Sequence, residues 1–317
     1  MSKKTIILTT LLGLLILTSC KKSNEHTKTA SQEKASNKSA RVFTETDARV
    51  TAGILFGENN TMYVAKHDEI LKITPDGKIS TFCNFKDITS DNNYFFNSPL
   101  IWDMTFDKQG NIIAAAQDRI MRITPDGKAS TIIQEDFGGF LGASGLELDG
   151  QGNMYVTNGS KIEKYTPDLK KTTFINADTN NYKSFFSLSF SPDGKNLYVT
   201  DFDTQTLIKY SINSDGNADE SSAKVIRTAE GTPGNFGAPL NIVFSDKGNM
   251  YVSMDGLGEI MKITPDEKIT YIDMGIDTLK NHIIAFGKKG FNEDSLYMTT
   301  FEGKQVYEFQ LGEKEAR

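Results

Sequence analysis

Hydrophobic and polar residues alternate along most of this chain in stretches of about five residues, separated by tight turns. Alternation with a period of two is typical of β-strands that bury one face. One unit recurs six times, and its second strand has an apolar or aromatic centre. The copies of this strand are TMYVA (61–65), NIIAA (111–115), NMYVT (153–157), NLYVT (196–200), NMYVS (249–253) and SLYMT (295–299).

The spacing of these copies predicts the fold class. Their central residues are Tyr63, Ile113, Tyr155, Tyr198, Tyr251 and Tyr297, at intervals of 42 to 53 residues. Such a period fits four-stranded propeller blades and is too long for leucine-rich or ankyrin repeats. Gly-rich turns precede the second strands, and third strands such as EILKI end in a TPD turn. We therefore predict an all-β, six-bladed β-propeller, whose ring is closed by the segment RVFTE that begins at Arg41.

The N-terminal residues have the composition of a secretory signal. Lys3 and Lys4 precede an apolar stretch that ends at Leu17-Thr-Ser-Cys20. This ending resembles the lipobox of bacterial lipoproteins, which implies cleavage before Cys20 and lipidation of its thiol. We expect a lipoprotein signal peptide in residues 1–19, a lipidated Cys20 with a flexible tether in residues 20–40, and the propeller in residues 41–317. Because Lys21 stands where Asp would favour the inner membrane, the expected location is the outer membrane of a bacterial envelope.

Composition limits the partners. The chain has two cysteines and a formal net charge of −6, although its first 40 residues are rich in Lys. A lipidated Cys20 would leave Cys83 alone, so no intramolecular disulfide is expected. An acidic propeller repels phosphate backbones, so nucleic acid is not an expected partner. We expect a monomer that contacts the membrane only through its lipid anchor.

Three segments resemble the senescence marker protein and gluconolactonase family, which is related to the NHL-repeat and streptogramin lyase propellers. They are FSLSFSPDGKNLYVTDFDTQTLIKYSINSDGN (186–217), GAPLNIVFSDKGNMYVS (237–253) and NHIIAFGKKGFNEDSLYMTTFEGKQVYEF (281–309). The resemblance implies a hydrolase in which a divalent cation, calcium or magnesium, is held on the propeller axis by Glu, Asn and Asp ligands. Such a cation polarises a lactone carbonyl and activates water.

The ligand positions of that family do not carry over to this chain. The Glu falls near Ala52, the Asn positions fall near Ser144 and at Phe186, and the Asp falls at Leu240. None of these residues is a carboxylate or an amide. A shift of one residue would bring Asn241 into the last position, and Asp103 is the other weak candidate for a metal ligand. We therefore expect a degenerate metal site.

The loops before the innermost strands predict a ligand pocket at one end of the axis. Its candidate residues are Trp102, Ser144, Phe186, Asn241, Asn281 and Tyr94. Tyr94 belongs to a long insertion, residues 83–99, whose aromatic side chains either stack on a ligand or cover the end of the propeller. The insertion at residues 213–222 does not have the ligand spacing of an EF-hand and is expected to be a solvated hairpin.

Two functions of different classes remain. The first is a lipid-anchored propeller that binds a small molecule, a glycan or a protein at its mouth. The second is a lactone hydrolase or a streptogramin-lyase-like enzyme with a rearranged site. His282 would be the general base of such an enzyme and Asp103 a second catalytic candidate, with Asn241 beside them. The alternative for His282 is a structural hydrogen bond.

Overall fold

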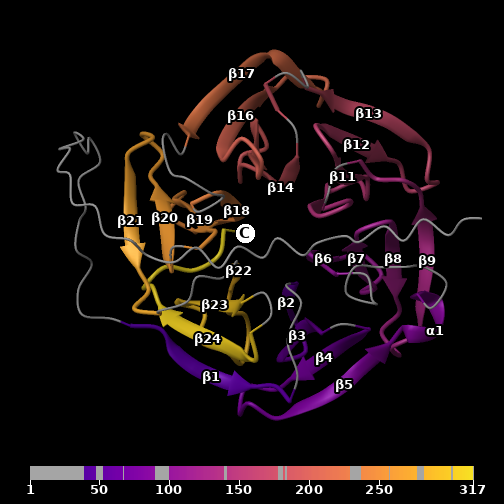
Figure 1. Ribbon diagram of the computed structural model, residues 1–317, viewed down its shortest axis with the longest axis vertical. Coiled ribbons are helices and arrows are strands. Elements are labelled where there is room, and N and C mark those ends of the chain that lie inside the picture. The colour runs from indigo at the N-terminus through magenta and orange to yellow at the C-terminus, as the bar shows by residue number, and fades with distance from the viewer. Residues whose placement is uncertain are drawn as a thin grey trace, which may run out of the picture. The chain divides into compact units, whose positions relative to one another are not determined.

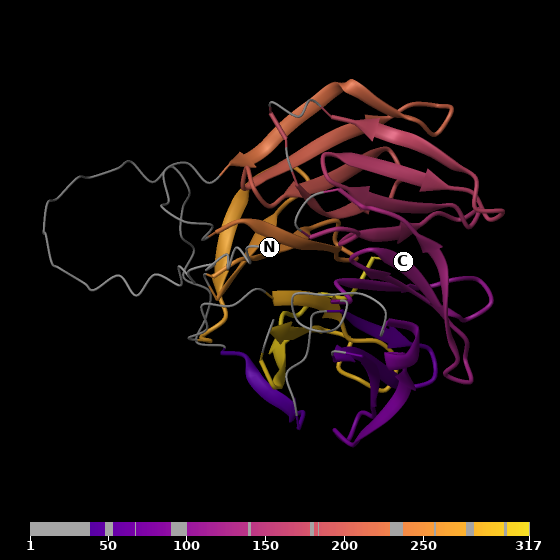
Figure 2. The ribbon, with the colours of Figure 1, turned by 45° about the vertical axis from the view of Figure 1, so that its right-hand side comes forward.

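The computed structural model describes residues 39–47, 53–66, 68–89, 100–138, 141–177, 181–182, 184–228, 237–256, 258–276, 282–300 and 303–316. All of them belong to one compact unit, Gln32–Arg317. Their strands form six sheets of four antiparallel strands, arranged as the blades of a propeller ring (Figures 1 and 2). The predicted six-bladed all-β fold is therefore confirmed.

Each blade runs from the axis to the rim of the ring. The innermost strands, which begin each blade, are β2 (Ile54–Gly57), β6 (Asp103–Phe106), β10 (Leu146–Leu148), β14 (Phe185–Phe190), β18 (Pro239–Phe244) and β22 (His282–Phe286). The second strands are β3 (Thr61–Lys66), β7 (Ile112–Ala116), β11 (Met154–Asn158), β15 (Asn196–Asp201), β19 (Met250–Met254) and β23 (Ser295–Thr300).

The third strands are β4 (Glu69–Ile73), β8 (Arg119–Ile123), β12 (Lys161–Tyr165), β16 (Thr206–Ile212), β20 (Glu259–Ile263) and β24 (Gln305–Gln310). The outermost strands are β5 (Ile79–Asn84), β9 (Ala129–Gln134), β13 (Lys171–Asn176), β17 (Ala218–Thr228), β21 (Ile269–Asp273) and β1 (Arg41–Glu45). A single helix occurs in the described ranges, α1 (Lys86–Thr89), and no helix there has the length and apolar character needed to cross a membrane.

The ring closes as the sequence predicts. The N-terminal strand β1 pairs antiparallel with β24, so the last blade contains strands from both ends of the chain (Figure 1). Arg41 lies opposite Glu308 in this register, and its Nη2 atom donates to the Glu308 Oε2 atom at 2.7 Å. Closure covers the edge that β24 would otherwise expose to solvent.

The turns after the third strands have a shared local cause. Four of them begin with a Thr whose hydroxyl donates to the Asp two residues later, at Thr74, Thr124, Thr166 and Thr264. The fourth residue has a positive φ, which Gly77 and Gly127 adopt without strain. Leu169 and Glu267 adopt φ 62° at the same position. The hydroxyl contact and the backbone hydrogen bonds of the turn hold these two residues there.

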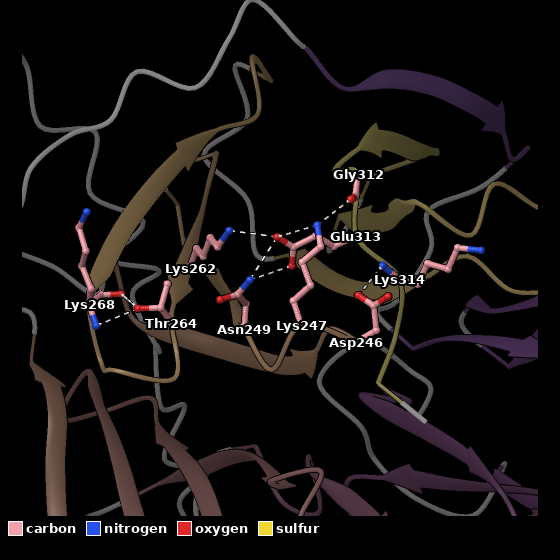
Figure 3. A network of polar contacts seen from close by, with 9 residues as sticks. All are labelled: Asp246, Lys247, Asn249, Lys262, Thr264, Lys268, Gly312, Glu313 and Lys314. Atoms are coloured by element: carbon pink, nitrogen blue, oxygen red, sulfur yellow. Dashed lines mark hydrogen bonds and ion pairs between the residues drawn. The ribbon is translucent and has the colours of Figure 1, made fainter.

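The segment after β24 was not anticipated from the sequence. Residues 312–316, which we call the C-terminal strap, cross from the last blade to the neighbouring one (Figure 3). The backbone N–H of Asp246 donates to Lys314 O at 2.7 Å, and that of Ala316 donates to Phe244 O at 2.8 Å. Glu313 is buried and accepts hydrogen bonds from the amide of Asn249 at 2.9 and 3.1 Å.

Glu313 connects three elements through its carboxylate. Burial acts to raise its pKa, but hydrogen bonds from Asn249 and Lys262 outweigh burial and lower the pKa to about 2. Lys262 Nζ lies 3.1 Å from its Oε1 atom (Figure 3). A folded-state pKa below the unfolded value of 4.5 adds stability above that pH, and this stability is lost as the pH falls toward 2.

We predict that Glu313→Gln lowers the free energy of unfolding at pH 7 by about 1 to 3 kcal/mol, because the charged hydrogen bond with Lys262 is lost in a buried setting. Urea unfolding at pH 7 and pH 3 measures this effect, and the difference between wild type and variant should shrink at pH 3. Glu293→Gln is the control, since Glu293 pairs with Lys314 at an exposed site and should change stability little. Equal effects of the two variants would contradict the role of Glu313.

Candidate functional site

The two ends of the propeller axis differ in the chain segments that reach them. We call the end where the innermost strands begin the start face, and the end where they turn into the second strands the turn face. The predicted site residues Trp102, Ser144, Phe186 and Asn241 all stand at or next to the beginnings of innermost strands, toward the start face. The C-terminal strap lies at the turn face, because it pairs with the residues that follow β18.

An apolar cluster crosses the axis near the start face. Its members come from all six blades, whereas each of the other buried clusters joins neighbouring blades. We call the part around the axis the axial cluster. It consists of Leu100, Trp102, Leu141, Phe186, Leu240 and Ile283.

The structure brings Trp102 and Phe186 together. Their ring centroids lie 5.4 Å apart at an interplanar angle of 71°, and Phe202 lies 6.3 Å from Phe186 on its other side. Trp102 is 5% exposed and Phe186 is 2% exposed. Trp102 and Phe186, which the sequence analysis assigned to a ligand pocket, therefore pack on each other and are both buried. Their role in binding stays a prediction.

The positions that the sequence analysis matched to the family's metal ligands carry no carboxylate or amide. Phe186 and Leu240 belong to the axial cluster. The Ser144 hydroxyl is buried and lies within hydrogen-bond distance of Thr157 Oγ1 and Phe185 O, at 3.2 and 3.3 Å. Ala52 lies outside the described residues. Among the residues that are described, no group of three or more His, Cys, Asp or Glu side chains could hold a metal ion.

Asp103 and Asn241 have a shared structural task. The Asp103 Oδ2 atom accepts the backbone N–H of Leu146 at 3.1 Å, and Asn241 Oδ1 accepts that of Ile284 at 3.0 Å. In both cases the acceptor is on an innermost strand and the donor is on the innermost strand of the next blade. These strands are sheet edges, so their N–H groups need partners outside their own sheet. Asp103 and Asn241 thus fasten neighbouring blades together at the axis.

Glu147 makes a similar contact two residues further along its innermost strand and was missed from the sequence. Its Oε2 atom accepts the backbone N–H of Phe190 at 2.9 Å, again on the next blade. Burial raises the pKa of Glu147 to about 8, and the charge of Asp103 raises it further against the hydrogen bonds that lower it. Burial likewise raises the pKa of Asp103 to about 7. The sequence did contain a signal for Glu147. It is a charged residue in the middle of the innermost strand Leu146–Leu148, at a position where other blades have Thr105 or Ser189.

Both carboxyl groups keep some surface toward the axis, but protein surrounds them closely enough for desolvation to dominate their pKa values. Two interacting acids in such surroundings titrate as a pair. At neutral pH a proton on this pair removes the repulsion between them. The pair is therefore a polar, titratable layer beneath the axial cluster.

The remaining candidates lie at the limits of the described residues. Cys20, Tyr94 and Asn281 fall outside them. His282 is described only through its backbone, which pairs with Thr300 in the β22–β23 ladder. Of the hairpin predicted at residues 213–222, residues 213–217 form the turn between β16 and β17, and residues 218–222 are the beginning of β17. The Asn213 side chain accepts the N–H groups of Asp215 and Asn217 in this turn.

Comparison with known proteins extends this picture. Residues 21–302 match the family model described as "SMP-30/Gluconolactonase/LRE-like region". The chain belongs to this family. A search of curated proteins returned no significant match.

Solved structures with this propeller include proteins of different activities. A gluconolactonase of Xanthomonas campestris aligns at 15% identity over 86% of this chain and 89% of its own, with a TM-score of 0.63. Virginiamycin B lyase of Staphylococcus aureus, an inactive His-to-Ala variant with quinupristin, aligns at 15% identity over 86% and 98%, with a TM-score of 0.58. An auxiliary nutrient binding protein of Bacteroides thetaiotaomicron aligns at 12% identity over 86% and 70%, with a TM-score of 0.61. At these identities the likeness shows the fold alone.

We predict that Glu147→Gln reduces the pH dependence of stability. Its folded-state pKa lies above the unfolded value of 4.5, so the native state binds more protons, and wild-type stability should fall as the pH rises from 5 to 8. Removing this charge should make the variant more stable than wild type at pH 8 by about 2 kcal/mol, with a smaller difference at pH 5. Chemical unfolding at the two pH values measures the change. Asp215→Asn in the 213–217 turn is the control, and a wild-type slope in Glu147→Gln would contradict the assignment.

Proposed function

We propose that this protein binds a small molecule or a glycan at the start face of its propeller, above the axial cluster, and does not perform the metal-dependent lactone hydrolysis associated with its family. The site keeps the position of a family active site at the end of the axis. Its chemistry differs, because aromatic and aliphatic side chains stand where oxygen ligands would be needed.

The observation that carries this proposal is the packing of Phe186 against Trp102 across the axis. A divalent cation such as calcium requires six to eight oxygen ligands, and magnesium prefers octahedral oxygen coordination. The side chains of Phe186 and Leu240 have no oxygen, Ser144 offers one buried hydroxyl, and the Asn241 amide oxygen already accepts the backbone N–H of Ile284. The residues present do not fit the family's cation, so no reaction step is assigned to one.

An apolar floor with aromatic edges is suited to binding. Aromatic rings stack on the apolar faces of sugar rings and on flat ligands, while polar groups at the rim fix orientation. The related fold of a protein named for nutrient binding supports this class of function without assigning a ligand. A protein ligand remains an outcome of the test described below.

A hydrolase or lyase with a rearranged site is the second candidate, and one observation favours it. The pKa of Asp103, raised by burial to about 7, lies in the range suited to general acid–base catalysis. The group is nevertheless engaged on both oxygens, by the N–H groups of Met104 and Leu146 at 2.8 and 3.1 Å. This arrangement holds the strands together and leaves the binding function better supported.

The test uses Trp102, which is the only tryptophan of the chain. We predict that a panel of oligosaccharides and sugar lactones contains ligands that shift Trp102 emission saturably in the presence of EDTA, without turnover of any lactone. Phe186→Leu should weaken binding by roughly tenfold, since it removes one aromatic contact of the floor. Phe82→Leu, far from the axis on β5, should leave binding unchanged.

Two results would sink this proposal. One is a tightly bound divalent ion in elemental analysis of the purified protein, lost in Asn241→Ala. The other is lactone hydrolysis or elimination that disappears in Asp103→Asn while the fold persists. A panel without any ligand, combined with capture of a specific protein through the start face, would instead assign the face to protein binding.

We further propose that the protein is anchored in the bacterial outer membrane through lipidated Cys20. The support is the sequence Leu17-Thr-Ser-Cys20, followed by Lys21 and a polar segment. We predict that Cys20→Ser moves the protein from the membrane fraction to the soluble fraction of the envelope, because acyl chains supply the binding energy. Fractionation with immunodetection measures the shift. Cys83→Ala is the matched cysteine control, and unchanged membrane association of Cys20→Ser would overturn the assignment.

A further inference from the structure

A tyrosine contact recurs between neighbouring blades. The central Tyr of a second strand packs against the Phe that ends the innermost strand of the next blade, at five of the six junctions. The pairs and centroid distances are Tyr63–Phe106 at 5.9 Å, Tyr155–Phe190 at 5.0 Å, Tyr198–Phe244 at 5.6 Å, Tyr251–Phe286 at 6.1 Å and Tyr297–Phe56 at 5.1 Å. These rings fill the gap between the sheets toward the turn face.

The junction between the blade of β6–β9 and the blade of β10–β13 departs from this rule on both sides. Ile113 stands where the other second strands have Tyr, and Leu148 stands where the other innermost strands have Phe. Both replacements are smaller than the rings that they replace. The contact also loses the phenol group, which in Tyr155 donates to Asp149 Oδ2 at 3.1 Å.

A cation accompanies the tyrosine in most blades. Each tyrosine position of a second strand pairs with one residue of the third strand in the same blade. From the first blade to the last, these third-strand residues are Lys72, Arg122, Lys164, Lys209, Lys262 and Glu308. Lys164 lies over the Tyr155 ring at 5.3 Å, and Lys262 lies over the Tyr251 ring at 5.6 Å. Arg122 lies opposite Ile113, so the corresponding ring is missing. Its Nε atom is buried and has no hydrogen-bond partner among the described residues.

A cavity of about 450 Å³ occupies this junction. Its inner lining includes Ile113, Leu148, Met154 and the side chain of Arg122, and turns from both blades surround its opening. The acidic groups in the lining are Asp107 and Asp149, and both are engaged in their own turns. Asp107 accepts from the backbone and amide of Asn111, and Asp149 accepts from the same groups of Asn153.

The cavity therefore combines apolar walls with one guanidinium group that lacks a partner at its buried nitrogen. A planar guanidinium binds a carboxylate through two parallel hydrogen bonds, and the low-dielectric surroundings strengthen such a contact. The apolar part of the lining, Ile113, Leu148 and Met154, stands where a tyrosine meets a phenylalanine at the other junctions. A ring with a short acidic substituent matches both features.

We propose that this junction is a binding site for a small aromatic carboxylate, separate from the start face. The ring lies between Ile113 and Leu148, in the place of the missing tyrosine, and the carboxylate pairs with Arg122. Lys108, on the turn between β6 and β7, adds a second positive charge at the opening of the cavity.

Benzoate is the probe, and isothermal titration calorimetry of the full-length chain is the measurement. We expect saturable binding at one site. Benzyl alcohol is a neutral analogue of similar size, and wild type should bind it at least roughly tenfold more weakly than benzoate. The variant Arg122→Met should bind benzoate at least roughly tenfold more weakly than wild type does, because a charged hydrogen bond is lost in both cases. Lys164→Met is the matched control on the next blade and should bind benzoate as wild type does.

Ile113→Tyr is the decisive variant. It introduces the residue found at the other five junctions, so the ring should fill the cavity, abolish benzoate binding and raise the melting temperature. Absence of saturable benzoate binding to wild type would overturn the proposal. So would binding that persists unchanged in Ile113→Tyr or Arg122→Met, or benzyl alcohol that binds as tightly as benzoate.

Discussion

Everything in this ring depends on the contact between one blade and the next. A single four-stranded sheet cannot bury its own faces, so each blade is stable only when its neighbours cover it. The tyrosine of the second strand supplies this cover by packing on the phenylalanine of the next innermost strand, as Tyr155 does on Phe190. Such aromatic pairs contribute about 0.5 to 1.5 kcal/mol each beyond the area that they bury. The sequence repeat therefore follows from this contact, because each blade needs one tyrosine and one phenylalanine at the same two positions.

The axis imposes a second constraint with consequences for function. Innermost strands are sheet edges, and polar side chains such as Asp103, Glu147 and Asn241 hold the N–H groups of the neighbouring blade. The apolar cluster that contains Trp102 and Phe186 also draws members from the beginnings of innermost strands. Blade attachment and apolar packing thus involve the residues at the beginnings of the innermost strands, which is where we propose that this chain differs from the metal-dependent members of its family.

The repeat made the fold predictable, because strand alternation, turn residues and spacing all report local chemistry. The closure by the strand at Arg41 was predictable for the same reason, since an open edge requires a partner. The C-terminal strap was not, because Glu313 has partners 64 residues away and no periodic signal. At the site, the strand pattern placed Phe186 at the beginning of an innermost strand, where the structure also has it. It could not show that Phe186 meets Trp102 there, since this depends on how blades face each other across the ring.

The junction at Ile113 shows why such exceptions carry information. A gap between packed sheets costs stability in proportion to its volume, and a buried cationic nitrogen without a partner adds to that cost. Both costs fall on one junction here, and a bound ligand would remove both at once. Binding to the folded state alone raises stability with ligand concentration. Occupancy of this cavity would therefore tighten the contact between the two blades, and through Asp103 and its bond to Leu146 at the same junction it would also bear on the start face.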